Sequence, residues 1–389
     1  MIFKERIIMV LLLPLYVLIR IISPIILIRF GSIKSHRIGH FVGNIDMYLR
    51  EQDHGIQPKN SFDIFFIDRK YNNYVCNYQL LKMWKRILLV NQVAYYLNRI
   101  NLRFNNAQKH SIKTEYADRD VFGLFEKSST HLYFTSEEKE KAKAGLKKMG
   151  IEEDAPFVCV VNRDSAYLSK TFPKKDWSYH NFRDSNIQNY TLAADWLTTQ
   201  NYFVIRMGSE VKELMRTNNP MTIEYAHKGF RTELLDIYLG ANCYFFISNG
   251  TGIDTIPKVF RRPILYVNYH IVRKYELFWN LKSLGIFKKY WLKNERRFMT
   301  FREILNSPVC GFFYLHEYEE CGIELIENTP EEILDATIEM EERLKGTWQV
   351  TEEDEELHRR CCALFKTDHK AVGFRIGSRF LFNNRDLID

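Results

Sequence analysis

Residues 243–267 read CYFFISNGTGIDTIPKVFRRPILYV, and this stretch decides the fold class. It contains two apolar runs, 243–247 and 264–267, which are typical of strands buried on both faces. Between them, residues 248–252 predict a turn and residues 252–260 a helix. A strand, a turn, a helix and a second strand of these lengths form a right-handed parallel βαβ unit.

The same alternation continues along most of the chain. Further strands are expected at 33–40, 62–68, 157–161 and 202–206, and helices at 42–50, 79–97, 136–149, 189–199, 231–239 and 329–345. This pattern predicts an α/β protein of two Rossmann-like lobes with a boundary between 135 and 155. The expected parts are a membrane anchor at 1–32, an acceptor-side lobe at 33–150, and a second lobe with C-terminal helices at 151–389.

The composition excludes several classes of protein. With 389 residues, 46% of them hydrophobic and 14% aromatic, the chain is neither disordered nor a small disulfide scaffold. Its seven cysteines are scattered without a C-x-x-C pair, which favours reduced thiols over a zinc site or a disulfide framework. We therefore expect no metal and no bound cofactor.

Charge is distributed unevenly. Residues 1–40 carry +5, residues 316–357 carry −14 and the last 32 residues carry +4, so the body between 41 and 315 carries +12. A basic body suits an anionic ligand, with phosphate as the first candidate. Nucleic acid is not expected, because no basic helix with regularly interleaved aromatic residues is present.

The N-terminal segment 7–28 is apolar over 22 residues and contains one charge, Arg20. Such a helix is about 33 Å long, enough to cross the hydrocarbon layer, but Pro14, Pro24 and Arg20 disfavour a straight span. Three membrane-bound alternatives stay open: a span, a bent re-entrant hairpin, and a helix lying in the interface. A buried helix of a soluble protein is the fourth alternative.

Basic residues follow this segment, which favours a body on the cytoplasmic side of the membrane. They are Lys34, Arg37 and Arg50. The expected location is therefore the inner membrane, with the body facing the cytoplasm and a membrane surface as one partner.

The turn Ser248-Asn249-Gly250-Thr251-Gly252 is the first candidate for binding chemistry. It follows a buried strand and precedes a helix, where main-chain N–H groups and the helix dipole favour phosphate oxygens. The turn matches neither a P-loop nor a dinucleotide fingerprint. The alternative is an ordinary strand-to-helix turn capped by Thr251.

Two other strands also end in polar residues. Arg163-Asp164-Ser165-Ala166-Tyr167 follows the strand at 157–161, and Arg206-Met207-Gly208 ends the strand at 202–206. Arg163 is expected to grip a diphosphate through its planar guanidinium, and Arg183 in the following polar loop to order the site. Surface ion pairs and a solvated loop are the alternatives for these arginines.

A general base is expected in the first lobe. His40, at the end of the predicted strand at 33–40, is one candidate for deprotonating a hydroxyl; Asp46, six residues later, is the other. A single histidine is more often structural, so the base is left open between these two.

Several pieces of the chain resemble a family of bacterial glycosyltransferases from surface-polysaccharide loci. They are Arg37–His40, 157–168, 182–187, 204–208, 248–252 and 327–332. The chain also looks like a distant relative of two-lobed GT-B enzymes, and its Ser-Asn-Gly-Thr-Gly turn resembles the phosphate turn of heptosyltransferases. Fucosyltransferases of this kind place an arginine after a His-x-Arg-type strand; here Asn162 stands near that histidine, so donor identity is not carried over.

The resemblance implies a sugar transfer. The donor would be a nucleotide sugar bound by the second lobe, and the acceptor a glycan or lipid-linked glycan. The expected mechanism is inverting and metal-independent, with His40 or Asp46 as base. The expected donor-binding residues are Arg163, Asp164, Tyr167, Arg183, Arg206, Gly208, Ser248, Asn249, Gly250, Thr251 and Gly252. A non-catalytic sugar-nucleotide-binding scaffold and a nucleotide-sugar epimerase are the alternatives.

Overall fold

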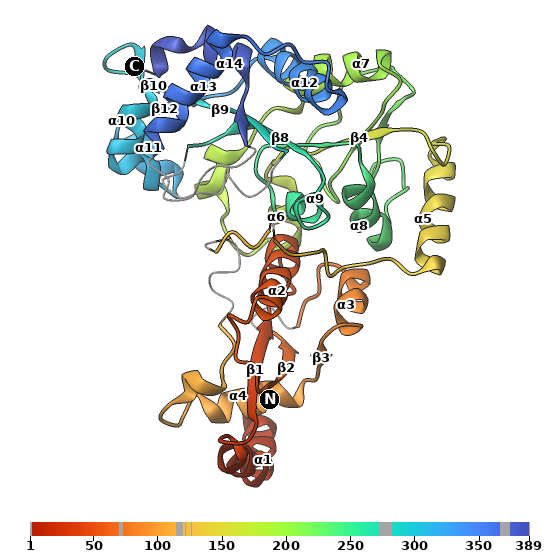
Figure 1. Cartoon of the computed structure of the whole chain (residues 1–389), viewed down its shortest axis with the longest axis vertical. Helices are drawn as coiled ribbons and strands as arrows, with labels where there is room; N and C mark the ends of the chain where they lie inside the picture. The colour runs from red at the N-terminus through yellow and green to blue at the C-terminus, as the bar shows by residue number, and fades with distance from the viewer. Residues whose placement is uncertain are drawn as a thin grey trace. The chain divides into compact units, whose positions relative to one another are not determined.

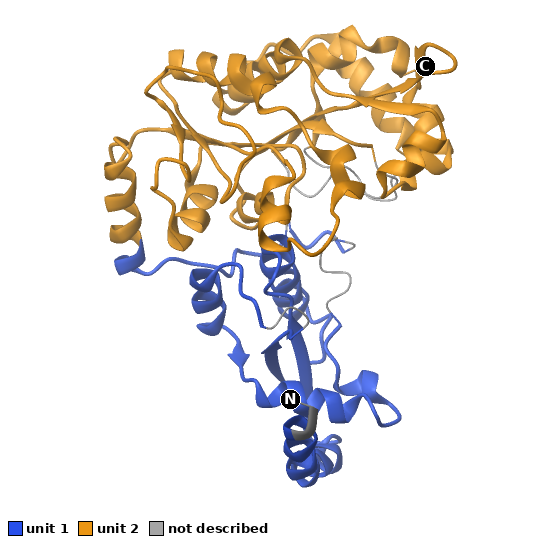
Figure 2. Cartoon of the chain, turned by 180° about the vertical axis from the view of Figure 1, so that it is seen from behind, with its two compact units in different colours: residues 1–138 blue, residues 139–389 orange. Residues whose placement is uncertain are grey.

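The computed structural model describes residues 2–69, 73–113, 120, 122–125, 127–271, 282–365 and 374–388. The chain divides into two compact units, Met1–Glu138 and Lys139–Asp389, which Figure 2 shows in two colours. Each unit has a parallel sheet of its own. The division falls inside helix α5 (Ser136–Lys148).

Unit 2 is built on a seven-stranded parallel sheet with the order β13-β9-β8-β7-β4-β5-β6. The strands are β4 (Phe157–Val160), β5 (Phe203–Arg206), β6 (Thr222–Glu224), β7 (Phe246–Ser248), β8 (Ile264–Tyr269), β9 (Leu284–Phe287) and β13 (Arg375–Ile376). The chain runs from β4 through β5 to β6 at one edge, then crosses to the other side of β4 with β7. This is the strand order of doubly wound α/β folds.

Helices cover both faces of this sheet, which is why its strands are apolar throughout rather than alternating. All residues of β4 and β8 are buried. In Figure 1, α7, α12, α13 and α14 lie on one side of the sheet and α8 and α9 on the other. The helices of unit 2 are α6 (Ala166–Thr171), α7 (Thr191–Thr199), α8 (Glu233–Asn242), α9 (Thr255–Val259), α10 (Phe301–Asn306), α11 (Leu315–Glu320), α12 (Pro330–Lys345), α13 (Glu352–Leu364) and α14 (Ser378–Asn383).

The acidic helix α12 begins and ends where its sequence signals place it. Thr329 and Glu332 form a capping box at its start, and Gly346 ends it in the left-handed conformation with φ of 76°. A small antiparallel sheet follows β9, with the order β11-β10-β12. Its strands are β10 (Lys289–Leu292), β11 (Arg297–Phe298) and β12 (Ile323–Ile326).

Unit 1 contains a three-stranded parallel sheet in the order β1-β2-β3. Its strands are β1 (Leu27–Ile33), β2 (Ser61–Ile67) and β3 (Leu89–Val90), and its helices are α1 (Ile2–Ile22), α2 (Ile38–Asp53), α3 (Tyr78–Lys85) and α4 (Val93–Asn101). Helix α1 packs on α4, β1 and β2 through Met9, Tyr16 and Ile19. The first 32 residues therefore pack as part of unit 1.

The structure corrects the expected course of the N-terminal third. The apolar segment 7–28 is divided between α1 and β1, so it is neither one helix nor a hairpin of two helices. The expected strand 33–40 is wrong, because β1 ends at Ile33 and α2 begins at Ile38. The expected helix 79–97 is two helices, α3 and α4, separated by β3. Among the described residues, none of the helices has both the length and the hydropathy needed to cross a membrane.

Candidate active site

The strand order of the unit 2 sheet reverses between β4 and β7: β5 and β6 are added on one side of β4, and β7 and the later strands on the other. Strands β4 and β7 are neighbours, although β5 and β6 lie between them in the sequence. In open α/β sheets, ligands bind beyond the carboxyl ends of the strands at such a point, and we call this region of unit 2 the β4–β7 crevice. Asn162 and Arg163 follow β4, and Asn249 and Gly250 follow β7.

Asn249 joins the segments around this crevice. Its Oδ1 accepts a hydrogen bond from the main-chain N–H of Arg163 at 2.8 Å. Its Nδ2 donates to the carbonyl oxygen of Arg183 and to Ser185 Oγ, both at 3.0 Å. The Asn249 side chain is buried, so each of these bonds satisfies a group that has no access to water.

The segment 178–185 lies beside the same strand ends. It contains a 3-10 helix (Ser178–Arg183), and Ser185 pairs with the end of β4 through two bonds. The Ser185 N–H donates to the carbonyl oxygen of Arg163 at 3.1 Å, and Asn162 Nδ2 donates to the carbonyl oxygen of Ser185 at 2.7 Å. These bonds fix the polar loop that holds Arg183 against the sheet.

Three cationic side chains lie at this segment: Arg163 and Lys288 reach it from strand ends, and Arg183 belongs to it. Arg163 donates to the carbonyl oxygen of His180 at 3.0 Å and pairs with Asp184. Arg183 donates to the carbonyl oxygen of Gly250. Lys288, directly after β9, donates to the carbonyl oxygens of Phe182 and Asp184 at 3.1 and 2.6 Å.

Burial is the main cause of the pKa shifts at this site, and neighbouring cations add to it. Burial, followed by repulsion from Arg183, lowers the pKa of Arg163 to about 10. Burial also lowers the pKa of Lys288 to about 8, with Arg163 adding to the effect against the opposing attraction of Glu327. His270, directly after β8, has a pKa well below its usual value because of burial and of all three cations. An anion entering here would relieve this repulsion.

Asp164 and Gly208 shape the neighbouring loops. Asp164 accepts hydrogen bonds from the main-chain N–H groups of Ala166 and Lys212, both at 2.9 Å, and so ties the loop after β4 to the loop after β5. Gly208 has φ of 129°, which suits glycine. Tyr167 lies in the short helix α6 and is half-buried.

Arg206 was expected to bind the diphosphate, and its position in the structure differs from that expectation. It is the last residue of β5 and is 2% exposed. Its guanidinium donates to Asn162 Oδ1 at 2.7 Å and to the carbonyl oxygen of Glu213, and it lies 3.4 Å from Glu224. Arg206 therefore positions the loops behind the crevice and presents no accessible group to a ligand.

The turn after β7 also differs from its expected structure, in which main-chain N–H groups are available to bind phosphate. Ser248 Oγ donates to Asp254 and accepts hydrogen bonds from the N–H groups of Gly250 and Thr251, so these N–H groups already have a partner. Instead of the expected helix at 252–260, Gly252–Asp254 forms a 3-10 turn and α9 is five residues long. A helix this short has a weak dipole, so side-chain cations dominate the charge at this site.

Position 250 requires a glycine. Its φ is 84°, and a Cβ built there would lie 3.0 Å from Cε2 of Tyr269 on β8. Beside it, Thr251 Oγ1 is buried and makes no hydrogen bond within the described part of the chain. A hydroxyl in that state is a candidate donor to a ligand oxygen.

The two candidate bases lie in helix α2 of unit 1. Asp46 is completely buried and forms an ion pair with Arg50 at 2.6 Å, so its carboxylate is closed to solvent. His40 is half-buried, and its Nδ1 lies 3.4 Å from Asn44 Oδ1. Between the two, the imidazole of His40 is the more accessible base.

Sequence reasoning missed Lys288 and His270. Both follow strands, but neither belongs to a recognisable motif. The available signal was a lysine pair interrupting the apolar run LGIFKKYWL at 284–292. A charge inside such a run must have buried partners, which Lys288 finds in two carbonyl oxygens.

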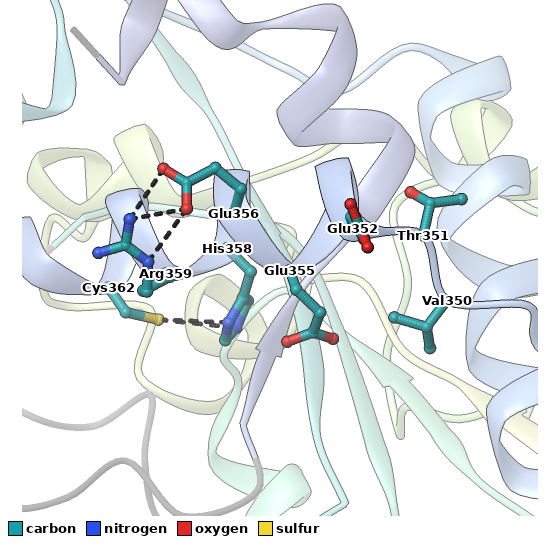
Figure 3. Close-up of a pocket in the computed structure, with 8 residues that line it drawn as sticks. All are labelled: Val350, Thr351, Glu352, Glu355, Glu356, His358, Arg359 and Cys362. Carbon is teal, nitrogen blue, oxygen red and sulfur yellow. Dashed lines mark hydrogen bonds and ion pairs between the residues drawn. The ribbon is translucent and has the colours of Figure 1, made fainter.

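A separate surface pocket lies along α13 and is lined by Val350, Thr351, Glu352, Glu355, Glu356, His358, Arg359 and Cys362 (Figure 3). Cys362 Sγ lies 3.6 Å from His358 Nε2. Burial raises the pKa of the Cys362 thiol to about 11 and lowers the pKa of His358 to about 4. An activated thiolate needs shifts in the opposite directions, so these pKa shifts do not favour a nucleophile and its base.

The sequence matches no family model and no curated protein. Two solved structures are similar to the chain. E. coli ADP-heptose LPS heptosyltransferase II is 10% identical, with a TM-score of 0.41 over 82% of this chain and 100% of that chain. A glycosyl transferase family 9 protein from Veillonella parvula is 11% identical, with a TM-score of 0.39 over 66% and 84%. Similarity at this level does not bear on the substrate or the activity of this chain.

Proposed function

We propose that the protein is a glycosyltransferase whose unit 2 binds the diphosphate of a nucleotide sugar at the β4–β7 crevice. The observation that carries this proposal lies at the point where the strand order of the sheet reverses. There Arg163 and Lys288 donate to the 178–185 segment, and Arg183 reaches from that segment to the Gly250 carbonyl oxygen. A doubly wound sheet supplies the crevice, and the cations supply the charge that a diphosphate requires. The resemblance of the same segments to sugar transferases supports the reaction class.

The proposed reaction is an inverting transfer. An acceptor hydroxyl oxygen forms a bond to the anomeric carbon while the bond from that carbon to the diphosphate oxygen breaks. His40 takes the hydroxyl proton, and the nucleoside diphosphate leaves with the bonding electron pair. The positive side chains stabilise the negative charge that develops on the leaving diphosphate, which is the electrostatic part of the catalysis.

The residues divide into three roles under this proposal. Arg163, Arg183 and the Thr251 hydroxyl contact the diphosphate. Lys288, which is 3% exposed and donates to two carbonyl oxygens, adds positive charge from behind the 178–185 segment. Asn249, Asp164, Arg206 and Ser248 position the main chain around these groups. The acceptor is a glycan or a lipid-linked glycan, and the positive charge of this chain's side chains stands in place of a metal.

The first experiment is a ligand screen. Purified full-length protein is titrated with UDP-, GDP-, ADP-, dTDP- and CMP-sugars in a thermal-shift assay, and the strongest ligand is confirmed by calorimetry. We expect one nucleotide class to raise the melting temperature. Failure of every nucleotide to bind a folded sample would overturn the proposal.

A transfer assay then separates the alternatives. Incubation of the identified donor with lipid-linked glycan extracts should release the nucleoside diphosphate and lengthen the glycan, as detected by mass spectrometry. Donor binding without transfer to any glycan would instead support a scaffold. A changed sugar on the donor, formed without an acceptor, would support an epimerase.

A further inference from the structure

Helix α1 has two different sides. One side packs on unit 1: Met9, Tyr16 and Ile19 are buried against α4, β1 and β2. The opposite side is apolar and exposed, with Val10 at 70%, Leu11 at 73% and further residues Ile7, Val17, Leu18 and Ile21. At 100° per residue these six side chains fall within one half of the helix circumference, on the side away from Tyr16.

The exposed apolar surface extends beyond the helix. Ile25, in the turn before β1, is 82% exposed. We call Ile25, together with the six residues of α1, the α1 surface. A contiguous patch of this kind on a folded protein marks an interaction surface.

Polar contacts hold α1 on unit 1 along its whole length. Near its start, Glu5 pairs with Arg99 at 2.7 Å and with Arg69 at 3.3 Å. In the middle, Tyr16 donates to Asn101 Oδ1 at 3.0 Å, and near the end Arg20 donates to the carbonyl oxygen of Asn105 at 3.0 Å. A helix tied at three points to its own unit presents one side to its surroundings and does not stand free of the protein.

The charges around the α1 surface indicate its partner. Residues 1–22 and 93–113, which include α1, α4 and the loop after α4, hold seven lysines and arginines and one acid. That acid is Glu5, which is already paired with two arginines. The flanking bases Lys4, Arg6, Arg103 and Lys109 are exposed. An apolar strip bordered by cations is complementary to a bilayer that contains anionic lipids.

We infer that the α1 surface binds a membrane containing anionic lipids, with α1 lying parallel to the bilayer and its apolar side inserted among the headgroups and upper acyl chains. A protein partner would supply apolar contacts but gives no reason for the excess of positive charge. The inference is independent of the proposed sugar transfer, because none of its residues belongs to the β4–β7 crevice. Together with the transfer it would place the enzyme where lipid-linked acceptors are concentrated.

The test uses full-length protein in vesicle flotation. Wild-type protein should float with phosphatidylcholine vesicles that contain one quarter phosphatidylglycerol, and bind pure phosphatidylcholine vesicles at least tenfold more weakly. The double variant Leu11→Glu/Leu18→Glu should lose at least tenfold in binding to the anionic vesicles. Leu192→Glu is the matched control, since Leu192 is an exposed leucine on α7 of unit 2, and it should bind as the wild type does.

Each other outcome overturns the inference. Equal flotation of Leu11→Glu/Leu18→Glu and wild type, with circular dichroism showing both folded, would mean that another surface binds the vesicles. A wild type that stays off both kinds of vesicle but forms a dimer by light scattering, which the double variant does not form, would assign the α1 surface to a second copy of the chain.

A separate experiment measures the orientation of α1 relative to the bilayer. Tryptophan is introduced at Leu11 or at Ile21, and its quenching by brominated lipids is measured as a difference from the wild type. A helix parallel to the bilayer places both positions at the same shallow depth. Deep quenching at position 11 with shallow quenching at position 21 would indicate a spanning helix and contradict the parallel orientation.

Discussion

The side chain of Asn249 accepts a hydrogen bond from the main-chain N–H of Arg163 at 2.8 Å, across 86 residues of sequence. Through this bond the end of β7 determines where the chain leaves β4. The same side chain donates to the segment that holds Arg183 and Ser185, so one amide fixes the three pieces of main chain around the crevice. The positions of the two arginines therefore depend on a residue that needs no contact with the ligand.

Replacing this amide tests its positioning role. Asn249→Ala removes the partner of the half-buried Arg163 N–H and Arg183 carbonyl oxygen, which should cost about 2–4 kcal/mol in free energy of unfolding. Denaturant titration measures this cost, and calorimetry should show weaker nucleotide binding. Asn242→Ala is the control, because Asn242 makes a comparable bond to the Tyr238 carbonyl oxygen at a half-buried site outside the crevice. Equal destabilisation by the two variants would contradict a special role for Asn249.

A methyl group added at Gly250, in the turn after β7, should also lower the stability of the protein. Gly250→Ala combines a left-handed backbone conformation with a Cβ only 3.0 Å from the Tyr269 ring, and we expect a loss of about 1–2 kcal/mol in stability. Gly311→Ala has no atom within 4 Å of the new methyl and should change stability by less than about 0.5 kcal/mol. Thermal unfolding of the two variants compares them directly. Full stability of Gly250→Ala would mean that the turn relaxes freely and does not fix the crevice.

The lowered pKa of Lys288 predicts opposite effects of pH on nucleotide binding and on the stability of the protein. Because its folded pKa is about 8, its positive charge is lost as the pH rises from 7 to 9, and nucleotide affinity should fall several-fold over that range. Its pKa is higher in the unfolded chain, about 10.4, so between pH 8 and 10 the unfolded state binds more protons. The lysine therefore adds stability to the unliganded protein as the pH rises through that interval.

Calorimetry and denaturant titration across this pH range check both signs. Lys288→Met should flatten the dependence of affinity on pH, whereas Lys212→Met, at an exposed lysine, should retain it. A Lys288→Met protein that keeps the full fall in affinity would show that another group titrates.

Substitution of the two candidate bases should affect different properties, namely the transfer rate for His40 and the stability of the fold for Asp46. His40→Ala should lower the rate of transfer by about 10²–10⁴-fold, as expected for loss of a general base, with little change in stability. Asp46→Asn leaves Arg50 buried without its carboxylate and should cost about 3–5 kcal/mol in stability. Measuring kcat and the unfolding midpoint for both variants distinguishes them. Unchanged turnover in His40→Ala would remove it from the mechanism.

The sequence was most informative where apolar runs are long and buried. The strands at 62–68, 157–161 and 202–206 and the helix at 329–345 agree with β2, β4, β5 and α12 to within about two residues at each end. Periodicity failed where elements are very short. Strand β3 has two residues, so it could not be seen between α3 and α4.

The charged residues at the strand ends were harder to assign. Their positions in the sequence show which strand they follow, but whether a side chain faces a crevice or the interior depends on partners elsewhere in the chain. The Arg206 side chain points inward, where it contacts Asn162 and Glu224. Lys288 points to the 178–185 segment, where it donates to two carbonyl oxygens. Such pairings join residues far apart in sequence, so no local pattern contains them.

The central claim is that the cations of the β4–β7 crevice bind a diphosphate. The most direct test measures by calorimetry the affinity for the nucleotide sugar found in the ligand screen, comparing wild type, Arg163→Ala, Arg163→Lys and, as a control, Arg359→Ala at an exposed arginine paired with Glu356. Loss of the charge-assisted hydrogen bonds should weaken binding by about 10–100-fold in Arg163→Ala, less in Arg163→Lys, and not at all in Arg359→Ala. A folded Arg163→Ala protein that binds the nucleotide sugar as tightly as wild type would contradict the account.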